Sequence, residues 1–252
     1  MGRRLGQHFL FDPSILRRIA DAAQLSAAET VLEIGPGKGT LTRHLAERAG
    51  RVIAIEADRA LAAALVSHQP APNVEIIAGD ALQVDWPRAD VIAGNIPYQI
   101  TSPLIERALE HHPTRIVFLV QKEVAERLAA APGSKQYGAL SVGVQLAAKV
   151  EQLFTVRAGS FSPPPKVESA VVRLTPIRSS AHPLIRPLVQ ALFQRRRQQL
   201  QRSLREFLSS HSPRPTPHAR DLLAAAGLPP ETRPEQLSPG QFLDLARRIA
   251  AS

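Results

Sequence analysis

The chain contains no cysteine among its 252 residues. This absence excludes disulfide bonds, thiolate metal ligands and cysteine nucleophiles, and it suits a reducing cytoplasm. No apolar run approaches the roughly 20 residues that a membrane-spanning helix needs. The N-terminal Met1-Gly2-Arg3-Arg4 is charged, but no apolar segment of a secretory signal follows it. We therefore expect a soluble, cytoplasmic protein without a metal centre, whose 44% apolar residues suffice for a sizeable core.

Acidic residues are scarce towards the C-terminus. Residues 177–252 carry 12 Lys and Arg against 5 Asp and Glu, a net charge of +7, whereas residues 1–176 carry 19 against 17. A basic segment behind a nearly neutral body predicts a polyanionic partner, most simply a nucleic acid. The alternative is ordinary solubility charge in a chain whose composition favours arginine.

Three alternate glycines end the apolar run that begins at Val31. The sequence from Val31 to Thr40 reads Val-Leu-Glu-Ile-Gly-Pro-Gly-Lys-Gly-Thr, and an amphipathic pattern follows it. This order predicts a strand, a tight glycine loop and a helix. A dinucleotide fingerprint would place its third glycine at Thr40, but the chain has Gly39 instead. The spacing of Gly35, Gly37 and Gly39 is typical of S-adenosylmethionine sites; the alternative is a purely structural turn.

Polar residues stand at the ends of three further expected strands. Glu56 closes the second strand, 21 residues after Gly35, where an acid binds ribose hydroxyls in nucleotide-binding α/β folds. Asp80 follows the third strand and can accept from an adenine amine, and Asn95 follows the fourth. Taken singly, each acid has a simpler interpretation as a solvated carboxylate. Because the carboxyl ends of parallel strands meet at one edge, we expect all four residues to form one site.

Strands and helices alternate over the first two thirds of the chain. Strands are expected before Gly35 and at residues 51–56, 74–78, 90–94, 115–120, 154–157 and 169–174. Helices are expected after Asp12-Pro13 and at residues 59–67, 123–130 and 139–148. This rhythm predicts a Rossmann-like α/β fold with a mostly parallel sheet, helices on both faces and a closing hairpin from the last two strands.

A Pro- and Ser-containing linker near residues 176–182 marks the expected domain boundary. We expect residues 1–178 to form the α/β domain and residues 179–252 a small, basic, all-α domain. The second domain is expected to contain a long helix at 184–209, a loop at 212–217 and helices at 219–226 and 239–250. Arg195, Arg196 and Arg197 interrupt the long helix. Consecutive helical positions turn by about 100°, so the three cannot all face a core.

The tetrapeptide Asn95-Ile96-Pro97-Tyr98 suits the methylation of a planar amine. The exocyclic nitrogen of adenine is a poor nucleophile because its lone pair is conjugated with the ring. The Asn95 side-chain carbonyl and a backbone carbonyl before or at Pro97 can accept from this amine and favour a pyramidal nitrogen. Pro97 fixes the backbone, and Tyr98 offers a ring on which an extruded base can stack. In an unrelated chain the tetrapeptide would be a turn with Tyr98 packed on the core.

Two further residues allow more than one interpretation. Phe161 precedes the rigid segment Ser162–Val167 and is either a second stacking face for the base or a core anchor for that segment. The residue pattern favours His8 as a loop residue that makes a backbone hydrogen bond over His8 as a catalyst.

These motifs resemble those of the ribosomal RNA adenine dimethyltransferases, over essentially the whole chain. Two branches share the Asn-Ile/Leu-Pro-Tyr motif, namely the small-subunit enzymes of the KsgA type and the enzymes that methylate large-subunit RNA and confer macrolide resistance. The stretches similar to the small-subunit branch are residues 137–142, 161–170, 193–197 and 233–242. The resemblance implies an enzyme that uses S-adenosylmethionine to dimethylate N6 of two adjacent adenines near the 3′ end of small-subunit (16S) RNA in an assembling 30S particle. We expect it to be a monomer.

The resemblance also implies site residues. Catalysis is assigned to Asn95, Pro97, Tyr98 and Phe161. Cofactor contacts are assigned to His8, Leu10, Gly35, Gly37, Glu56, Asp80, Ala81 and Asn95. RNA contacts are assigned to Arg195, Arg196, Arg197 and Arg202. His8 stands where many members have Asn, which favours a contact through its backbone. Two alternatives remain, namely the large-subunit resistance enzyme and a non-catalytic RNA-binding assembly or transcription factor on the same fold.

Overall fold

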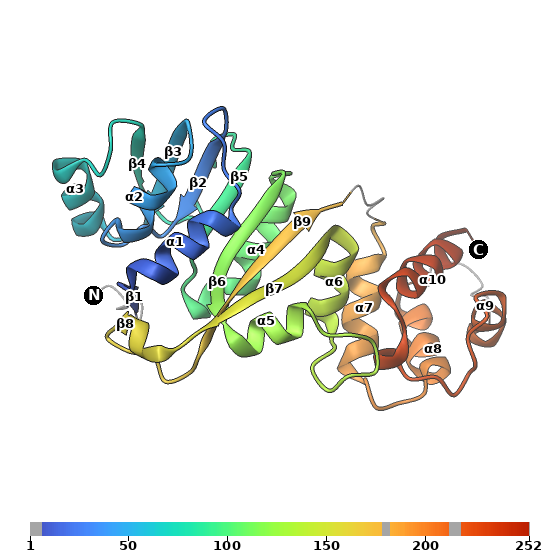
Figure 1. The fold of residues 1–252 in the computed structure, drawn as a ribbon. Helices are drawn as coiled ribbons and strands as arrows, with labels where there is room; N and C mark the ends of the chain where they lie inside the picture. Colours follow the sequence, from blue (N-terminus) through green and yellow to red (C-terminus); the bar gives the residue numbers. More distant parts are fainter. Residues whose placement is uncertain (1–6, 178–181, 212–217, 252) are drawn as a thin grey trace. The chain divides into compact units, whose positions relative to one another are not determined.

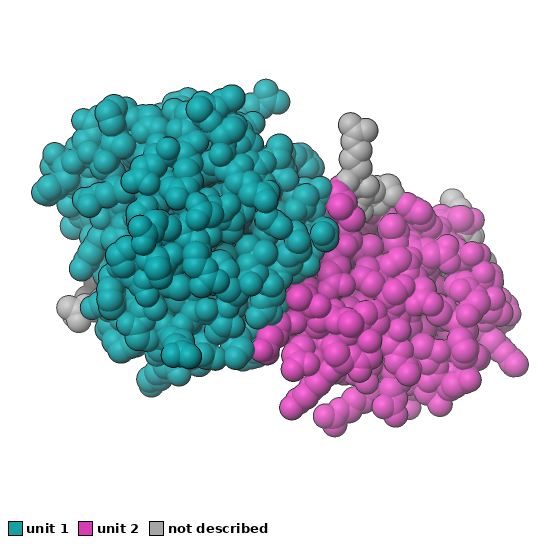
Figure 2. Space-filling model, viewed as in Figure 1, with its two compact units in different colours: residues 1–125, 148–176 teal, residues 126–147, 177–252 magenta. Residues whose placement is uncertain are grey.

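A computed structural model describes residues 7–177, 182–211 and 218–251 (Figure 1). The chain forms two compact units, which Figure 2 distinguishes by colour. The first comprises residues 1–125 and 148–176, and the second comprises residues 126–147 and 177–252. No helix among the described residues is long and apolar enough to cross a membrane. Within the same ranges, no three His, Asp or Glu side chains are grouped as metal ligands would be.

A seven-stranded sheet organises the first unit, in the order β4-β3-β2-β5-β6-β9-β7. Its strands are β2 (Thr30–Ile34), β3 (Arg51–Glu56), β4 (Val74–Ala78), β5 (Val91–Asn95), β6 (Arg115–Gln121), β7 (Ala148–Val156) and β9 (Ser169–Pro176). The first five in spatial order are parallel, and β9 runs antiparallel to both β6 and β7. The chain builds outward from β2 to β4 and then returns to add β5 and β6 on the other side of β2. Strand order therefore reverses between β2 and β5, where sheets of this kind bind ligands.

Helices cover both faces of this sheet, as the sequence predicts. They are α1 (Pro13–Ala22), α2 (Thr40–Ala46), α3 (Arg59–His68) and α4 (Thr101–Glu110); a further helix, α5 (Lys122–Leu128), begins in the first unit and ends in the second. In Figure 1, α1 and α2 lie on one side of the sheet and α4 on the other. Asp12 caps α1 as expected, since its Oδ1 accepts from Ser14 N at 2.9 Å and Pro13 takes the first position. Leu16 and Ile19 of α1 pack into one core with Val31 of β2.

A two-stranded sheet ties the N-terminal segment to a distant loop. β1 (Phe9–Leu10) pairs antiparallel with β8 (Phe161–Ser162), and Leu10 lies opposite Phe161. Both of these residues are buried in the same core as α1 and α2. The Thr40 hydroxyl at the start of α2 donates to Leu10 O at 3.0 Å, which fixes the segment against the glycine loop.

The second unit is helical. Its helices are α6 (Ala139–Ala147), α7 (Ile185–Gln194), α8 (Leu200–His211), α9 (Ala219–Ala225) and α10 (Pro239–Ala251). The chain's short 3₁₀ turns are η1 (Tyr98–Ile100) and η2 (Ala158–Ser160) in the first unit and η3 (Pro234–Gln236) in the second. The core holds Leu188, Leu204 and Phe242, all fully buried. Tyr137 is also fully buried there, and its hydroxyl donates to Leu237 O at 2.8 Å.

The structure differs from the sequence predictions at the domain boundary and at the end of one helix, and a third prediction falls on residues that it does not describe. Residues 126–147 belong to the second unit, because Tyr137 and Val142 lie in its core. The expected boundary at 178 therefore leaves out one of the two segments that form this unit. The helix expected to reach residue 148 ends at Ala147, and β7 begins at Ala148, where pairing with β9 decides the conformation. The expected loop at 212–217 lies outside the described residues.

The long helix predicted over 184–209 is two helices, and this prediction was wrong. Arg195 leaves helical geometry, with φ −125° and ψ 39°, and the next helix begins at Leu200. Leu200 N donates to Thr232 O at 2.7 Å, so a neighbouring loop satisfies the start of α8. The break separates the apolar stripes of the two helices, and the consecutive arginines fall within it.

Candidate functional site

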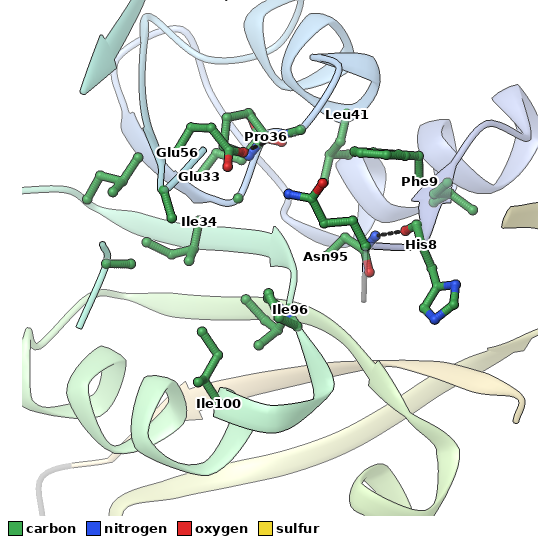
Figure 3. Close-up of a pocket in the computed structure, with 18 of the residues that line it drawn as sticks. His8, Phe9, Glu33, Ile34, Pro36, Leu41, Glu56, Asn95, Ile96 and Ile100 are labelled. Atoms are coloured by element: carbon green, nitrogen blue, oxygen red, sulfur yellow. Dashed lines mark hydrogen bonds between the residues drawn. The ribbon is translucent and has the colours of Figure 1, made fainter. Parts of the chain in front are cut away.

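A pocket opens at the carboxyl ends of β2, β3, β4 and β5 (Figure 3). Ten of the eleven residues predicted for the cofactor and the reacting base line it, namely His8, Leu10, Gly35, Gly37, Glu56, Asp80, Ala81, Asn95, Pro97 and Tyr98. They come from the N-terminal segment, the glycine loop and the ends of four strands. The structure therefore brings together the residues that the shared strand-end position predicted would meet.

The glycine loop needs residues without a side chain. Gly35, Gly37 and Gly39 have φ of 70°, 57° and 75°, a region that other residues rarely adopt. A Cβ on Gly37 would lie 3.0 Å from the Phe9 ring, so a side chain there would press on the N-terminal segment. The loop thus lines the pocket with backbone at Gly35 and Gly37 rather than with side chains.

Glu56 holds the glycine loop in place from the neighbouring strand. Its side chain is only 3% exposed. Oε2 accepts from Gly37 N at 2.9 Å, and Oε1 accepts from Asp58 N at 2.9 Å. Each oxygen keeps a further lone pair, so the carboxylate can also accept from a ligand hydroxyl.

Asp80 and Ala81 form the pocket wall beyond β4. Asp80 is exposed, and its Oδ1 accepts from Leu82 N at 2.9 Å. Ala81 is buried, and its carbonyl accepts from the indole nitrogen of Trp86 at 2.8 Å. The Arg107 guanidinium lies 5.0 Å from the centre of the Trp86 ring, so a cation–π contact fixes this loop to α4.

Asn95 has a defined side-chain orientation. Its Nδ2 donates to the main-chain carbonyl of His8 at 3.0 Å, the dashed contact in Figure 3. A carbonyl can only accept, so the nitrogen must face His8, and Oδ1 is left as the acceptor of this amide. The carbonyl of Pro97 already accepts from Ile100 N at 3.1 Å and from the Thr101 hydroxyl at 3.3 Å. Of the two backbone acceptors considered from the sequence, the carbonyl of Ile96 is therefore the better candidate.

Tyr98 and His8 form an aromatic pair at the pocket. Their ring centres are 6.0 Å apart with an interplanar angle of 29°. The Tyr98 hydroxyl lies 2.8 Å from Ser169 Oγ, and His8 Nδ1 donates to Pro163 O at 2.8 Å. Burial raises the pKa of the Tyr98 phenol above 10.0, while the hydrogen bond with Ser169 opposes that rise, so the ring remains neutral near pH 7.

Phe161 is not brought to this site. Its side chain is 3% exposed and packs in the core with Leu10 and Leu16. Of the two roles that the sequence allowed, the structure supports the core anchor, and the assignment as a stacking face is corrected. The ring that lies beside Tyr98 is His8: its hydrogen bond to a backbone carbonyl is the contact that the sequence favoured, whereas its contact with Tyr98 was not predicted.

Glu33 also lines the pocket, and the sequence reasoning missed it. It belongs to β2, directly before the glycine loop, and is 1% exposed. Burial raises the pKa of its carboxyl from 4.5 to about 8; the nearby Thr42 hydroxyl lowers it, and the negative charge of Glu56 raises it. An acid inside an otherwise apolar run was the signal that could have identified it.

The four arginines predicted to bind RNA differ in their surroundings. Arg195 Nη1 lies 2.7 Å from Glu206 Oε1, and Arg202 lies 3.7 Å from the same carboxylate. Arg196 bridges Glu235 at 2.8 Å and also donates to Lys135 O at 3.3 Å, which joins three segments of the second unit. Arg197 is exposed. Arg196 thus has a structural task, whereas Arg197 is exposed and the side chain of Arg202 is 69% exposed.

The fold and the site together define the class of protein. A sheet of six strands that run in one direction with a seventh, β9, inserted antiparallel, a G-x-G-x-G loop and an acid at the end of the next strand are the features of an S-adenosylmethionine-dependent methyltransferase.

Comparison with known proteins identifies the family within that class. The chain belongs to the ribosomal RNA adenine dimethylase family, whose model matches residues 2–251. Ribosomal RNA small subunit methyltransferase A from Myxococcus xanthus is 42% identical over 256 residues, which cover 97% of this chain and 89% of that protein. The crystal structure of a dimethyladenosine transferase from Plasmodium falciparum is 32% identical with a TM-score of 0.85, covering 94% of this chain and 96% of that one. The 23S rRNA methyltransferase ErmE is 30% identical with a TM-score of 0.74, covering 96% and 99%.

Proposed function

We propose that this enzyme transfers methyl groups from S-adenosylmethionine to N6 of two adjacent adenines near the 3′ end of small-subunit ribosomal RNA. The product is N6,N6-dimethyladenosine, formed while the small subunit matures. The single observation that carries this proposal is the orientation of Asn95, whose nitrogen is held by His8 O so that Oδ1 remains an acceptor in the pocket.

The order of the strands supports an assignment of cofactor contacts. Asp80 and Ala81 at β4 accommodate the adenine, and Glu56 at β3 accepts from the ribose hydroxyls. The glycine loop at β2 and the backbone of His8 and Leu10 surround the remaining amino-acid end. When bound, the cofactor supplies an electrophilic methyl group on a sulfonium.

The residues at β5 prepare the adenine amine. Asn95 Oδ1 and the carbonyl of Ile96 accept from the two N–H groups, which favours a pyramidal nitrogen and stabilises the positive charge that develops on it. Tyr98 provides a neutral ring on which the extruded base stacks. Each transfer forms one N–C bond, breaks one S–C bond and releases one proton to solvent, so no strong general base is required.

Small-subunit RNA is favoured over large-subunit RNA as the substrate. The Myxococcus xanthus protein named for the small subunit is 42% identical, and the dimethyladenosine transferase structure aligns with a TM-score of 0.85, against 0.74 for ErmE. A net charge of +7 over residues 177–252 supports RNA binding by the second unit, with Arg197 and Arg202 as the available contacts. We assign the activity to a monomer that acts on an assembling 30S particle in the cytoplasm.

Methylation mapping tests the proposal. The protein is incubated with labelled S-adenosylmethionine and immature small subunits, and the modified nucleotides are located by mass. Two dimethylated, adjacent adenines near the 3′ end of the small-subunit RNA are expected. A parallel incubation contains isolated large-subunit RNA, and label found there instead would support the resistance enzyme. Binding to small subunits without any label would support a non-catalytic assembly factor.

A further inference from the structure

Glu33 is a buried carboxyl for which the proposed reaction has no use. It lies at the end of β2 and lines the pocket, yet only 1% of it is exposed. Its Oε2 finds no hydrogen-bond partner among the described residues. Figure 3 shows it beside Glu56 and close to the glycine loop. A buried carboxylate oxygen without a donor is unusual, because such groups are normally paired.

Among the residues that the structure describes, no positive charge lies against Glu33. On the neighbouring strands its register partners are Ala54 of β3 and Ala93 of β5. On α2 it meets Thr42, whose buried hydroxyl lies near enough to lower the pKa of the carboxyl but makes no hydrogen bond of good geometry within the described ranges. The charged neighbour is Glu56 of β3, which is stabilised by two backbone N–H groups and repels a second negative charge. An isolated charge is strongly disfavoured in such surroundings, so the carboxyl of the free protein is neutral at pH 7.

The strand order indicates which part of the cofactor meets this carboxyl. The proposed contacts run from Asp80 at β4 through Glu56 at β3 to Asn95 at β5, where the methyl group must arrive. β2 lies between β3 and β5, so the amino-acid end of the cofactor lies over β2. That end carries an ammonium group, which is the positive charge that Glu33 lacks.

We propose that Glu33 is protonated in the free protein and ionises when the cofactor binds, so that its carboxylate pairs with the ammonium group and one proton is released. The O–H bond of the carboxyl breaks, the proton passes to the buffer, and no covalent bond forms with the ligand. The inference rests on the proposed function for the identity of the cofactor alone, since it requires neither RNA nor methyl transfer.

Cofactor affinity then depends on pH through this one residue. Below the pKa of the free carboxyl, binding must include ionisation of Glu33, and the affinity changes by up to tenfold per pH unit. We expect the affinity to rise about eightfold to tenfold between pH 6 and pH 7, where the free ammonium group, with an ordinary pKa of about 8, stays charged. His8, Asp80 and Tyr98 are the other titratable groups of the pocket besides Glu56; burial raises the pKa of Tyr98 above 10.0, and a variant must separate the contributions of His8 and Asp80.

Calorimetric titration of the full-length protein tests the proposal. Binding enthalpies are measured at pH 6.5 in buffers of different ionisation enthalpy, with S-adenosylmethionine and with S-adenosylhomocysteine, which keeps the ammonium but lacks the sulfonium. Release of close to one proton is expected for both ligands. Release near zero would overturn the proposal, and release with S-adenosylmethionine alone would overturn the ammonium as the partner.

Two variants localise the proton. Glu33→Gln is expected to release none and to bind with nearly the same affinity at pH 6 and pH 7. Glu75→Gln, which changes a half-exposed acid on β4 outside the pocket, is expected to behave as the unmodified protein does. Unchanged proton release in Glu33→Gln would contradict the assignment. If that variant does not fold, the unmodified protein still decides between one proton and none.

The outcome is separable from that of the proposed function. Proton-coupled binding without methylation of small-subunit RNA would remove the proposed substrate and leave Glu33 with its role. Methylation of the expected adenines by a protein that binds its cofactor without proton release would support the proposed function and contradict the proposed role of Glu33.

Discussion

At the scale of the residue, the chemistry depends on which end of one amide faces the pocket. Asn95 Nδ2 is engaged by a backbone carbonyl, and an amide with one end fixed presents the other end reliably. His8 contributes that carbonyl, while its ring is held by Pro163 O and lies beside Tyr98. The N-terminal segment is thus part of the site through its backbone as well as through its side chains.

Removing the Asn95 amide tests this arrangement. Asn95→Ala is expected to lower the single-turnover methylation rate by a factor on the order of 100 or more, because an acceptor for the reacting amine is lost. RNA binding, measured separately, is expected to stay within about twofold. Asn95→Asp keeps an acceptor but cannot donate to His8 O, so it also loses activity. Full activity in Asn95→Asp would contradict the importance of the fixed orientation.

Glu33 makes the folding stability depend on pH. Its pKa is raised from 4.5 to about 8 in the folded protein, so between these values the folded state binds the proton more tightly. The stability it contributes is present below pH 4.5 and is lost as the pH rises towards 8, a change on the order of 4 kcal/mol at 1.4 kcal/mol per pKa unit. Glu33→Gln is expected to lose this dependence. Denaturant unfolding of both proteins at pH 5 and pH 8 measures it; parallel changes in the two proteins would contradict the prediction.

At the scale of the element, the sequence predicted the strands better than it predicted where helices end. β2, β3, β4 and β6 are apolar runs closed by a polar or small residue, and that pattern is local. The break between α7 and α8 depends on Thr232, more than 30 residues away, which receives the N–H of Leu200. Phe161 was ambiguous because the sequence cannot show that β8 pairs with β1. Glu33 was missed because the sequence does not show that its carboxyl is buried in the pocket near the carboxylate of Glu56.

The arginines in the break between α7 and α8 and at the start of α8 are of two kinds. Arg197 and Arg202 are exposed, whereas Arg196 is bonded to other segments of the second unit. Replacing Arg197 and Arg202 by Gln is expected to weaken RNA binding and to reduce the slope of log K against log salt by about 1 to 2, because phosphate contacts are lost. Filter binding over a range of salt concentrations measures the slope. An unchanged slope would show that this surface does not face the RNA.

Arg196→Ala is the matched comparison within the same break. Arg196 joins Glu235 and Lys135 O, and its loss is expected to destabilise the second unit by about 1–3 kcal/mol. The salt slope of RNA binding is expected to change less than in the double variant. If Arg196→Ala reduced the salt slope as much as the double variant does and left the unfolding free energy unchanged, Arg196 would be an RNA contact and not a structural residue.

At the scale of the whole molecule, the two units are interleaved along the chain. Residues 126–147 leave the first unit, add Tyr137 and Val142 to the helical core, and lead back to β7 of the sheet. The composition could locate the basic region. It could not show that residues 126–147 join the second unit, because an aromatic residue such as Tyr137 could be buried equally well in the core of either unit.

A fragment of residues 179–252 tests this organisation. Without Tyr137 and its hydrogen bond to Leu237 O, the fragment lacks a fully buried aromatic ring of its core. We expect it to show little helical circular dichroism and no cooperative thermal transition. A helical fragment that unfolds cooperatively would show that residues 179–252 are an autonomous domain after all.

A crystal structure with S-adenosylmethionine bound tests the central claim most directly. The cofactor is expected along the strand ends, with its adenine at Asp80, its ribose at Glu56 and its methyl group directed towards Asn95 Oδ1. A cofactor bound away from the glycine loop, or an Asn95 amide turned so that its nitrogen faces the methyl group, would contradict the account.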